Sequence, residues 1–204
     1  GFVGEARWGV LNDARRLDRH ALPLMAQRYA LLAEDAGNAL HLPLAALRLK
    51  VDEAGRRATL AGLGLAPARP VVVLCPGAEY GVAKRWPARH FAEVARRCAA
   101  SGAEVWLVGS AKDAALGEEI SRASAGAAVN LCGKTTLAQA IDLMSLARLV
   151  VSNDSGLMHV AAALERRLVA VYGSSSPSFT PPLSAHARIV RLALPCSPCF
   201  KREC

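Results

Sequence analysis

The chain has 204 residues, with 25 Lys or Arg against 17 Asp or Glu, so that its formal net charge is +8. Hydrophobic residues make up 52% of it, which allows a sizeable core and excludes a disordered chain. No apolar run approaches the ~18 residues of a membrane-spanning helix, and because charged residues interrupt the first stretch we expect no signal peptide at its start. The charge favours an acidic partner, which could be a phosphorylated ligand, an anionic lipid surface or nucleic acid. Because aromatic residues are only 5% and never interleave with basic runs, we expect no platform for single-stranded nucleic acid, and our preferred interpretation has no nucleic-acid partner.

The first third of the chain predicts two helices and little else. Residues 22–34 carry apolar side chains at helical spacing and predict an amphipathic helix. Residues 47–51 alternate apolar and basic side chains, which is typical of a short strand or a linker. Residues 52–63 predict a second helix, with Asp52 as its N-cap. Neither end reads as a natural terminus, so we expect a piece of a longer protein.

From residue 70 onward, apolar strands alternate with amphipathic helices. Glycine or polar residues follow most of the strands. This alternation is typical of an α/β fold with a parallel sheet that helices cover on both faces. The expected strands are 71–75, 104–108, 129–131, 148–152 and 168–172, with 188–192 as a candidate sixth, and the expected helices are 87–101, 113–122, 136–146 and 155–163.

The segment that follows the first strand predicts a phosphate site. In open α/β sheets, ligands bind outside the carboxyl ends of the strands. Residues 76–87 contain two glycines, and two adjacent cations, Lys84 and Arg85, stand just before a helix. Glycine, positive charge and a helix N-terminus together favour an anion. The alternative is an ordinary surface loop with solvated charges.

A second strand-to-helix turn, at residues 152–159, has the same character. Either Asp154 or Ser155 is placed to cap the helix, and Gly156 lets a ligand approach the backbone. His159 follows Ser155 by four residues, so both are expected on one side of the helix. The alternative is a capped helix with a satisfied histidine.

The third glycine-containing turn, at residues 133–136, resembles part of a Walker A loop but lacks one of its glycines. Residues 133–136 look like the end of a Walker A loop, but Ala128 stands where that loop needs a glycine. A P-loop nucleotide hydrolase is therefore excluded. Gly133 and Thr135 still follow a strand, where they could touch a nucleotide.

The six cysteines fall into two groups. Three lie in apolar surroundings and predict small core residues, namely Cys75, Cys98 and Cys132. The other three, Cys196, Cys199 and Cys204, have half the spacing of a zinc signature. Their pattern leaves two interpretations open, a structural zinc site and free thiols. The spacing does not match a secreted disulfide scaffold, which favours a reducing compartment.

Several of these segments form one ordered set of motifs that covers nearly the whole chain. They are residues 4–13, 76–87, 109–113, 152–163, 172–177, 179–182 and 196–204. Together they resemble the lipopolysaccharide heptosyltransferases, and within that family the heptosyltransferase II branch.

The resemblance implies a GT-B glycosyltransferase, in which two Rossmann-like halves face each other across a cleft. Residues 48–204 would form the C-terminal, nucleotide-sugar-binding domain, and residues 1–47 the tail of the N-terminal acceptor domain and a linker. The implied reaction transfers heptose from ADP-heptose to the inner core of lipopolysaccharide, with inversion and without a metal. The implied protein is cytoplasmic, peripheral to the inner membrane and monomeric, with the acceptor at the membrane surface.

The resemblance also assigns roles to individual positions. Lys84 corresponds to the lysine that contacts the donor phosphates, where it would stabilise the charge of the leaving ADP. The family's catalytic base lies in the N-terminal half, and no residue here matches it. The implied donor-binding set is Gly77, Lys84, Ser110, Lys112, Asp113, Gly133, Thr135, Asp154, Ser155, Gly156 and His159. The alternatives are a non-catalytic nucleotide- or anion-binding module with a metal at the cysteine cluster, and a basic nucleic-acid binder.

Overall fold

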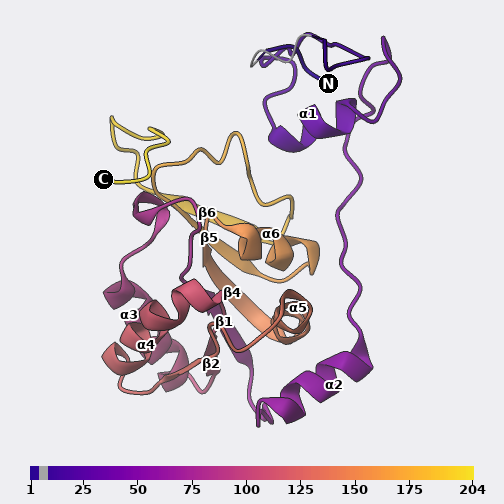
Figure 1. Ribbon diagram of the computed structural model, residues 1–204. Coiled ribbons are helices and arrows are strands. Elements are labelled where there is room, and N and C mark those ends of the chain that lie inside the picture. Colours follow the sequence, from indigo (N-terminus) through magenta and orange to yellow (C-terminus); the bar gives the residue numbers. More distant parts are fainter. Residues whose placement is uncertain (5–8) are drawn as a thin grey trace. The chain divides into compact units, whose positions relative to one another are not determined.

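The computed structural model describes residues 1–4 and 9–204, which form two compact units (Figure 1). The first unit is Gly1–Ala46 with Ser176–Pro181, and the second is Leu47–Ser175 with Pro182–Cys204. The short segment after the fifth strand thus belongs with the first unit, which the sequence pattern does not reveal. Residues 5–8, part of the motif at 4–13, lie outside the described residues.

The first unit is built around one short helix, α1 (Met25–Leu31). The Arg15 guanidinium donates hydrogen bonds of 2.6 Å to the carbonyl oxygens of Leu31 and Glu34, at the end of this helix. The Arg28 guanidinium lies 4.7 Å from the ring centroid of Phe179. The helix is shorter than the predicted 22–34, because the chain turns at both of its ends.

The second unit begins with an extended segment and a capped helix, α2 (Glu53–Gly62). The Asp52 carboxylate accepts a hydrogen bond from the Ala54 amide at 3.0 Å, which confirms the predicted N-cap. Of the two alternatives for residues 47–51, the strand is wrong and the linker agrees with the structure. That segment is mostly exposed, and its Leu49 amide bonds the Ala163 carbonyl instead of a neighbouring strand.

A six-stranded parallel sheet forms the centre of the second unit and confirms the predicted fold class. Its spatial order is β3-β2-β1-β4-β5-β6, which is the strand order of a Rossmann fold. The order reverses between β1 and β4, where such sheets bind their ligands. The strands are β1 (Val71–Cys75), β2 (Glu104–Leu107), β3 (Ala128–Asn130), β4 (Ala147–Asn153), β5 (Leu168–Tyr172) and β6 (Ala187–Arg191).

Helices cover both faces of this sheet. Helices α3 and α4 pack on one face, and α2, α5 and α6 pack on the other (Figure 1). Their bounds are α3 (Ala88–Ala100), α4 (Ala114–Ala123), α5 (Leu137–Ser145) and α6 (Gly156–Ala163), with the 3-10 turns η1 (Val82–Lys84) and η2 (Ala111–Asp113).

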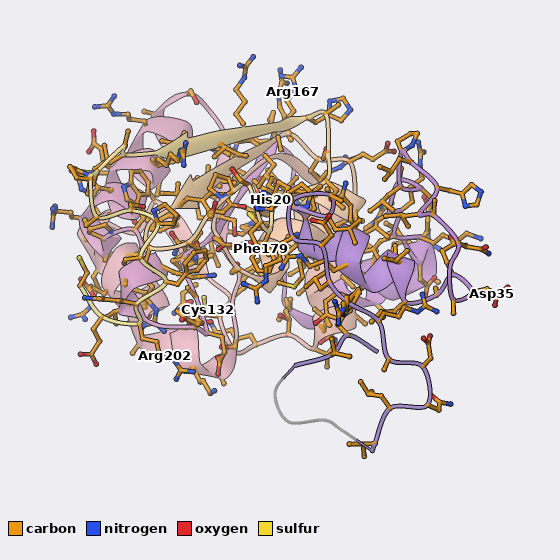
Figure 2. The ribbon with its side chains drawn as sticks, turned by 90° about the horizontal axis from the view of Figure 1, so that it is seen from above. His20, Asp35, Cys132, Arg167, Phe179 and Arg202 are labelled. Carbon is orange, nitrogen blue, oxygen red and sulfur yellow. The ribbon has the colours of Figure 1, made fainter. Side chains whose placement is uncertain are left out.

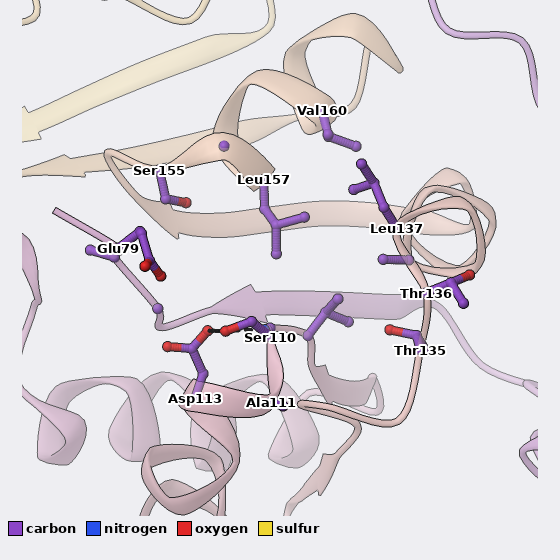
Figure 3. Close-up of a pocket in the computed structure, with 16 residues that line it drawn as sticks. Glu79, Ser110, Ala111, Asp113, Thr135, Thr136, Leu137, Ser155, Leu157 and Val160 are labelled. Carbon is purple, nitrogen blue, oxygen red and sulfur yellow. Dashed lines mark hydrogen bonds between the residues drawn. The ribbon is translucent and has the colours of Figure 1, made fainter.

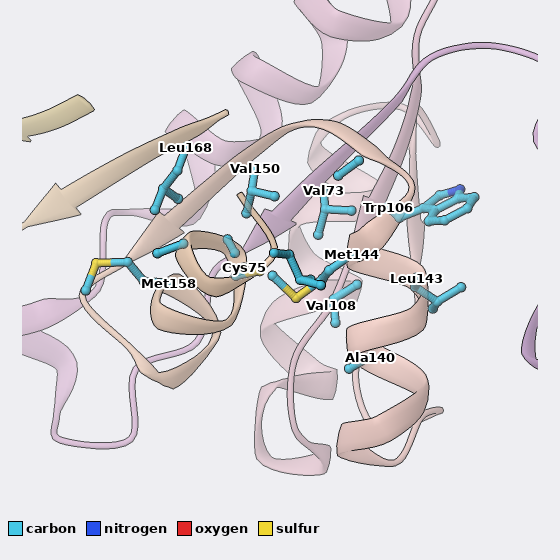
Figure 4. Close-up of a cluster of buried hydrophobic side chains, with 14 of the residues drawn as sticks. Val73, Cys75, Trp106, Val108, Ala140, Leu143, Met144, Val150, Met158 and Leu168 are labelled. Atoms are coloured by element: carbon cyan, nitrogen blue, oxygen red, sulfur yellow. The ribbon is translucent and has the colours of Figure 1, made fainter. Parts of the chain in front are cut away.

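The alternating strand residues fill two cores, one on each face. In β1, Val73 faces the α5 and α6 side with Met144 and Met158, while Leu74 faces Phe91 on the other side. Figure 4 shows the first of these clusters. Full burial of one such side chain stabilises the fold by about 1.5–3 kcal/mol. The strands therefore hold the turns at their carboxyl ends in fixed positions.

The described surface is polar and basic in places. Arg167 and Arg202 are exposed and project from the second unit (Figure 2). Among the described residues, no helix combines the length and the apolar character needed to cross a membrane.

Candidate functional site

A cavity of about 550 Å³ lies at the carboxyl ends of β1, β2 and β4, at the point where the strand order reverses (Figure 3). Six of the predicted donor-binding residues line it, namely Gly77, Ser110, Asp113, Thr135, Ser155 and Gly156. The sequence reasoning missed its apolar wall, which Leu137, Ala140, Leu157 and Val160 provide from α5 and α6. The cavity thus combines an apolar side with a polar edge, as nucleotide sites do.

Asp113 fixes the turn that follows β2. Its Oδ2 atom accepts hydrogen bonds from the Ser110 amide at 2.9 Å and from the Ser110 hydroxyl at 2.7 Å (Figure 3). A Cβ atom on Gly77 would stand only 2.5 Å from this same oxygen. The turns after β1 and β2 therefore touch, and only glycine fits between them.

An ion pair joins these two turns at the rim of the cavity. The Lys112 ammonium donates a hydrogen bond to the Glu79 carboxylate, and both side chains are exposed. The hydrogen bond from Lys112 lowers the pKa of Glu79, which keeps the pair charged. Lys112, one of the implied donor-binding residues, is in this structure bound to a carboxylate and does not line the cavity.

The N-terminus of α6 faces the cavity without a side-chain cap. Ser155 is the N-cap residue, but its hydroxyl makes no capping bond within the described residues and lies 3.3 Å from the Ser152 hydroxyl. Ser155 thus stands at one of the two expected N-cap positions, but the described residues show no capping hydrogen bond from its side chain or from that of Asp154. A Cβ atom on Gly156 would meet nothing within 4 Å. The first turn thus presents its backbone N–H groups toward open space, as anion sites do.

Asp154 does not cap because two other groups hold its carboxylate. Its Oδ2 atom accepts hydrogen bonds from the Lys84 ammonium at 2.6 Å and from the Ser175 hydroxyl at 2.5 Å. Asp154 is 5% exposed, so this pair is shielded from water. Lys84 and the α6 turn meet as the sequence reasoning required, but Lys84 does not line the first cavity. Ser175 was missed, although it too follows a strand.

The Asn153 side chain connects the turn after β4 to the loop between β1 and α3. It is fully buried at the end of β4. Its Nδ2 atom donates to the Pro76 carbonyl at 2.7 Å, and its Oδ1 atom accepts from the Trp86 amide at 3.0 Å. Both ends of the loop between β1 and α3 are thus fixed by one side chain. No local pattern signals this role, since its partners lie about seventy residues earlier in the chain.

His159 and Gly133 stand beside the cavity and do not line it. His159 is exposed on α6, yet desolvation by the surrounding turns lowers its pKa; Lys84 adds to this shift and Asp154 opposes it. Gly133 has a φ of +77°, and a Cβ atom there would stand 2.9 Å from the Ala111 Cα atom. Its role in this structure is close packing.

The cysteine cluster does not form the zinc site that was one of its two interpretations. Within the part of the chain that the structure describes, no three His, Cys, Asp or Glu side chains are grouped to hold a metal. Cys196, Cys199 and Cys204 are exposed free thiols along a second cavity of about 310 Å³. The zinc-like spacing of these cysteines in the sequence is therefore not matched by a grouping of their sulfur atoms in the described structure. Of the cysteines predicted in the core, Cys75 and Cys132 are buried and Cys98 is half-buried.

Comparison with known proteins decides between the remaining interpretations. The model of glycosyltransferase family 9 (heptosyltransferase) matches residues 1–204. The chain belongs to this family. It is 49% identical over 201 residues to lipopolysaccharide heptosyltransferase 2 of Salmonella typhimurium and, equally, of Escherichia coli K12. Each match covers 94% of this chain and 58% of the relative.

A solved structure supports the same family and the same fold. The structure of E. coli ADP-heptose lps heptosyltransferase II matches with a TM-score of 0.88 and 47% identity. The match covers 97% of this chain and 62% of that one. The chain thus spans less than two thirds of its relatives in this family. Its six-stranded parallel sheet matches a Rossmann-like half of a GT-B enzyme, which confirms the resemblance predicted from the motifs.

Proposed function

We propose that this chain is the donor-binding half of an enzyme that transfers heptose from ADP-heptose to the inner core of lipopolysaccharide. The observation that carries the proposal is the first cavity, which lies where the strand order reverses and opens onto the uncapped N-terminus of α6. The names of its relatives in glycosyltransferase family 9 supply the donor and the acceptor.

The cavity suggests how the donor lies. The apolar wall from α5 and α6 suits the adenosine, and the turn after β3, with Thr135, borders it. The diphosphate then reaches the N-terminus of α6 beside Gly156, where no side chain occupies the space. The sugar extends toward Asp154 and Lys84, which lie paired at the edge of the same turn. Ser110 and Asp113 shape the floor beneath the nucleotide.

The proposed chemistry is an inverting displacement at the anomeric carbon of the heptose. The acceptor hydroxyl attacks this carbon and gives its proton to a carboxylate base that we assign to the N-terminal half, because no residue of this chain matches it. The sugar–phosphate bond breaks and its electron pair leaves with ADP. The N-terminus of α6 and Lys84 would stabilise the charge that develops on the phosphate.

The remaining parts of the proposal concern where the enzyme works. Its acceptor is part of a lipid, so the reaction takes place at a membrane surface. A net charge of +8 would hold a peripheral protein near anionic lipids. We propose that it acts as a monomer on the cytoplasmic side of the inner membrane.

Calorimetry with ADP tests the donor site directly. We expect the chain to bind ADP, and Gly156→Val to weaken that binding at least tenfold, because its side chain fills the space before α6. Gly62→Val is the matched control, since Gly62 also has nothing within 4 Å of a Cβ atom but lies in α2, away from the cavity. A folded chain without measurable ADP affinity, or one in which both variants bind equally well, would refute the proposal.

A further inference from the structure

Asp154 stands where an aspartate commonly closes the start of a helix. It precedes α6 by two residues, and in an Asx turn the side chain of such a residue accepts a hydrogen bond from the amide two positions later. That amide belongs to Gly156, the first residue of α6. The partial positive charge of a helix N-terminus strengthens such a bond to a carboxylate. The local sequence therefore favours a helix that is capped by its own chain.

The structure holds this carboxylate elsewhere. Its Oδ2 atom accepts hydrogen bonds from the Lys84 ammonium at 2.6 Å and from the Ser175 hydroxyl at 2.5 Å. The Asp154 amide donates to the Val171 carbonyl at 3.1 Å, which fixes the backbone of this residue beside β5. Within the described residues, α6 has no side-chain cap. Its first turn therefore keeps its amides for another partner.

A self-capped α6 could not serve the proposed donor site. The carboxylate would take the amides that we assign to the donor diphosphate, and its negative charge would repel the phosphates. Two other carboxylates line the first cavity and are held by donors of their own: Glu79 is paired with Lys112, and Asp113 accepts two hydrogen bonds from Ser110. Because Asp154 stands directly before the helix, the groups that hold it decide whether α6 accepts an anion.

The two donors that hold Asp154 differ in what else they face. The Lys84 side chain is 17% exposed, and the proposed function assigns its ammonium to the phosphates as well. Ser175 is only 4% exposed, and its hydrogen bond to Asp154 lies in the interior. When a diphosphate draws on the charge of Lys84, the hydrogen bond from Ser175 still restrains the carboxylate.

The turn after β5 fixes the position of Ser175. The Ser174 amide donates to the Ala83 carbonyl at 3.2 Å, and the Ser174 carbonyl accepts from the Phe200 amide at 2.8 Å. A Cβ atom on Gly173 would stand 2.3 Å from the Ala83 carbonyl oxygen, so this turn lies directly against the loop between β1 and α3. Since Lys84 follows Ala83 in that loop, the two donors to Asp154 are anchored to each other.

We propose that Ser175 is a positioning residue of the donor site. It holds the Asp154 carboxylate away from the N-terminus of α6 and so keeps that terminus open for the diphosphate. This step rests on the proposed function, and Ser175 itself contacts no atom of the donor. Loss of its hydroxyl would let Asp154 form the Asx turn with Gly156, and the chain would then compete with its own ligand.

Calorimetry with ADP on the whole chain tests this role. Ser175→Ala is expected to lower the ADP affinity at least about fivefold, which is the typical effect of one N-cap bond. Ser174→Ala is the matched control, because it removes a buried hydroxyl of the same turn that has no hydrogen-bond partner within the described part of the chain. The control should change the affinity less than about twofold. An equal loss in the two variants, or no loss in Ser175→Ala, overturns the inference.

A double-mutant cycle with Asp154→Ala separates this role from a merely structural one. Without the carboxylate there is nothing for Ser175 to restrain. In the Asp154→Ala background, Ser175→Ala should therefore lower the ADP affinity less than about twofold. A loss as large as in the wild-type background would show that Ser175 acts without Asp154 and would contradict the proposal.

NMR of the Gly156 amide gives a readout that does not depend on ADP. In Ser175→Ala this amide proton should move downfield, because it then bonds a carboxylate, whereas Ser174→Ala should leave it in place. In the Asp154→Ala background, Ser175→Ala should not move it either. An unchanged Gly156 amide in Ser175→Ala refutes this inference even where ADP binds. A chain that does not bind ADP refutes the donor site instead, and the Gly156 amide then still decides whether Ser175 restrains Asp154.

Discussion

Two residues of one turn, Asn153 and Gly156, have opposite roles. Asn153 is fully buried and ties the loop after β1 in place, whereas Gly156 leaves space in front of α6. Between them, Asp154 turns away from the helix that it precedes and bonds Lys84 and Ser175. A strand-to-helix turn at the site thus combines residues that fix geometry with one that keeps room for a ligand. Changes at the first kind should affect stability, and changes at the second kind should affect binding.

The largest effect on stability is expected from Asn153→Ala. It leaves the Pro76 carbonyl and the Trp86 amide without partners in the interior, and each such group costs ~1–3 kcal/mol. We expect the free energy of unfolding in urea to fall by about 2–5 kcal/mol. Ser155→Ala, which removes only the contact with Ser152, should change it by less than about 0.5 kcal/mol. A loss below about 1 kcal/mol for Asn153→Ala would contradict its proposed role.

The pair of Lys84 and Asp154 should show strong coupling in a double-mutant cycle. Their side chains are 17% and 5% exposed, so removal of one partner leaves the other charge poorly solvated. We expect a coupling free energy of about 1–3 kcal/mol between Lys84→Met and Asp154→Asn in urea unfolding. The exposed pair of Lys112 and Glu79 is the comparison, with less than about 1 kcal/mol expected. Equal coupling in the two pairs would show that the buried ion pair does not hold the turns together.

The same alanine substitution should act differently at two glycines of the first cavity. In Gly77→Ala, the new Cβ atom would stand 2.5 Å from the Asp113 carboxylate, and such overpacking costs about 1–3 kcal/mol. In Gly156→Ala the Cβ atom meets nothing, so stability should stay within about 0.5 kcal/mol while ADP affinity falls. Thermal unfolding and calorimetry on both variants check this. A stable Gly77→Ala protein would mean that the contact between the two turns is not tight.

The sequence predicted most of the sheet because buried parallel strands are apolar without interruption. The strands predicted at residues 71–75 and 168–172 agree fully with the structure, and the others agree within one residue at each end. At residues 47–51 the strand alternative failed for a physical reason: alternation of apolar and polar side chains is a local property, whereas a strand exists only beside a partner. The return of Ser176–Pro181 to the first unit is also non-local, and nothing in its composition indicates it.

The candidate site was predictable to the extent that it follows from strand ends. The rule that ligands bind beyond the carboxyl ends led to Gly77, Ser110, Thr135 and Gly156, which all line one cavity. The hydrogen bonds that set its shape were not predictable, because Asn153 reaches partners about seventy residues away. The fold of the surrounding chain also decides how close the sulfur atoms of the three cysteines lie, so their spacing in the sequence could not show whether they form a metal site.

The smallest effect, at His159, separates a site that binds an anion from one that only resembles such a site. Desolvation and the nearby Lys84 lower the pKa of His159 below its usual 6.5. Between these two values the unfolded chain binds more protons than the folded one, so this histidine makes stability rise with pH through that window. A diphosphate at the N-terminus of α6 would favour the protonated imidazole, so ADP should raise the pKa of His159 and bind more tightly as the pH falls toward 6. NMR titration of the imidazole with and without ADP measures this shift. An unchanged pKa in the ADP-bound protein would place the phosphates away from α6. It would thereby refute the proposed orientation of the donor.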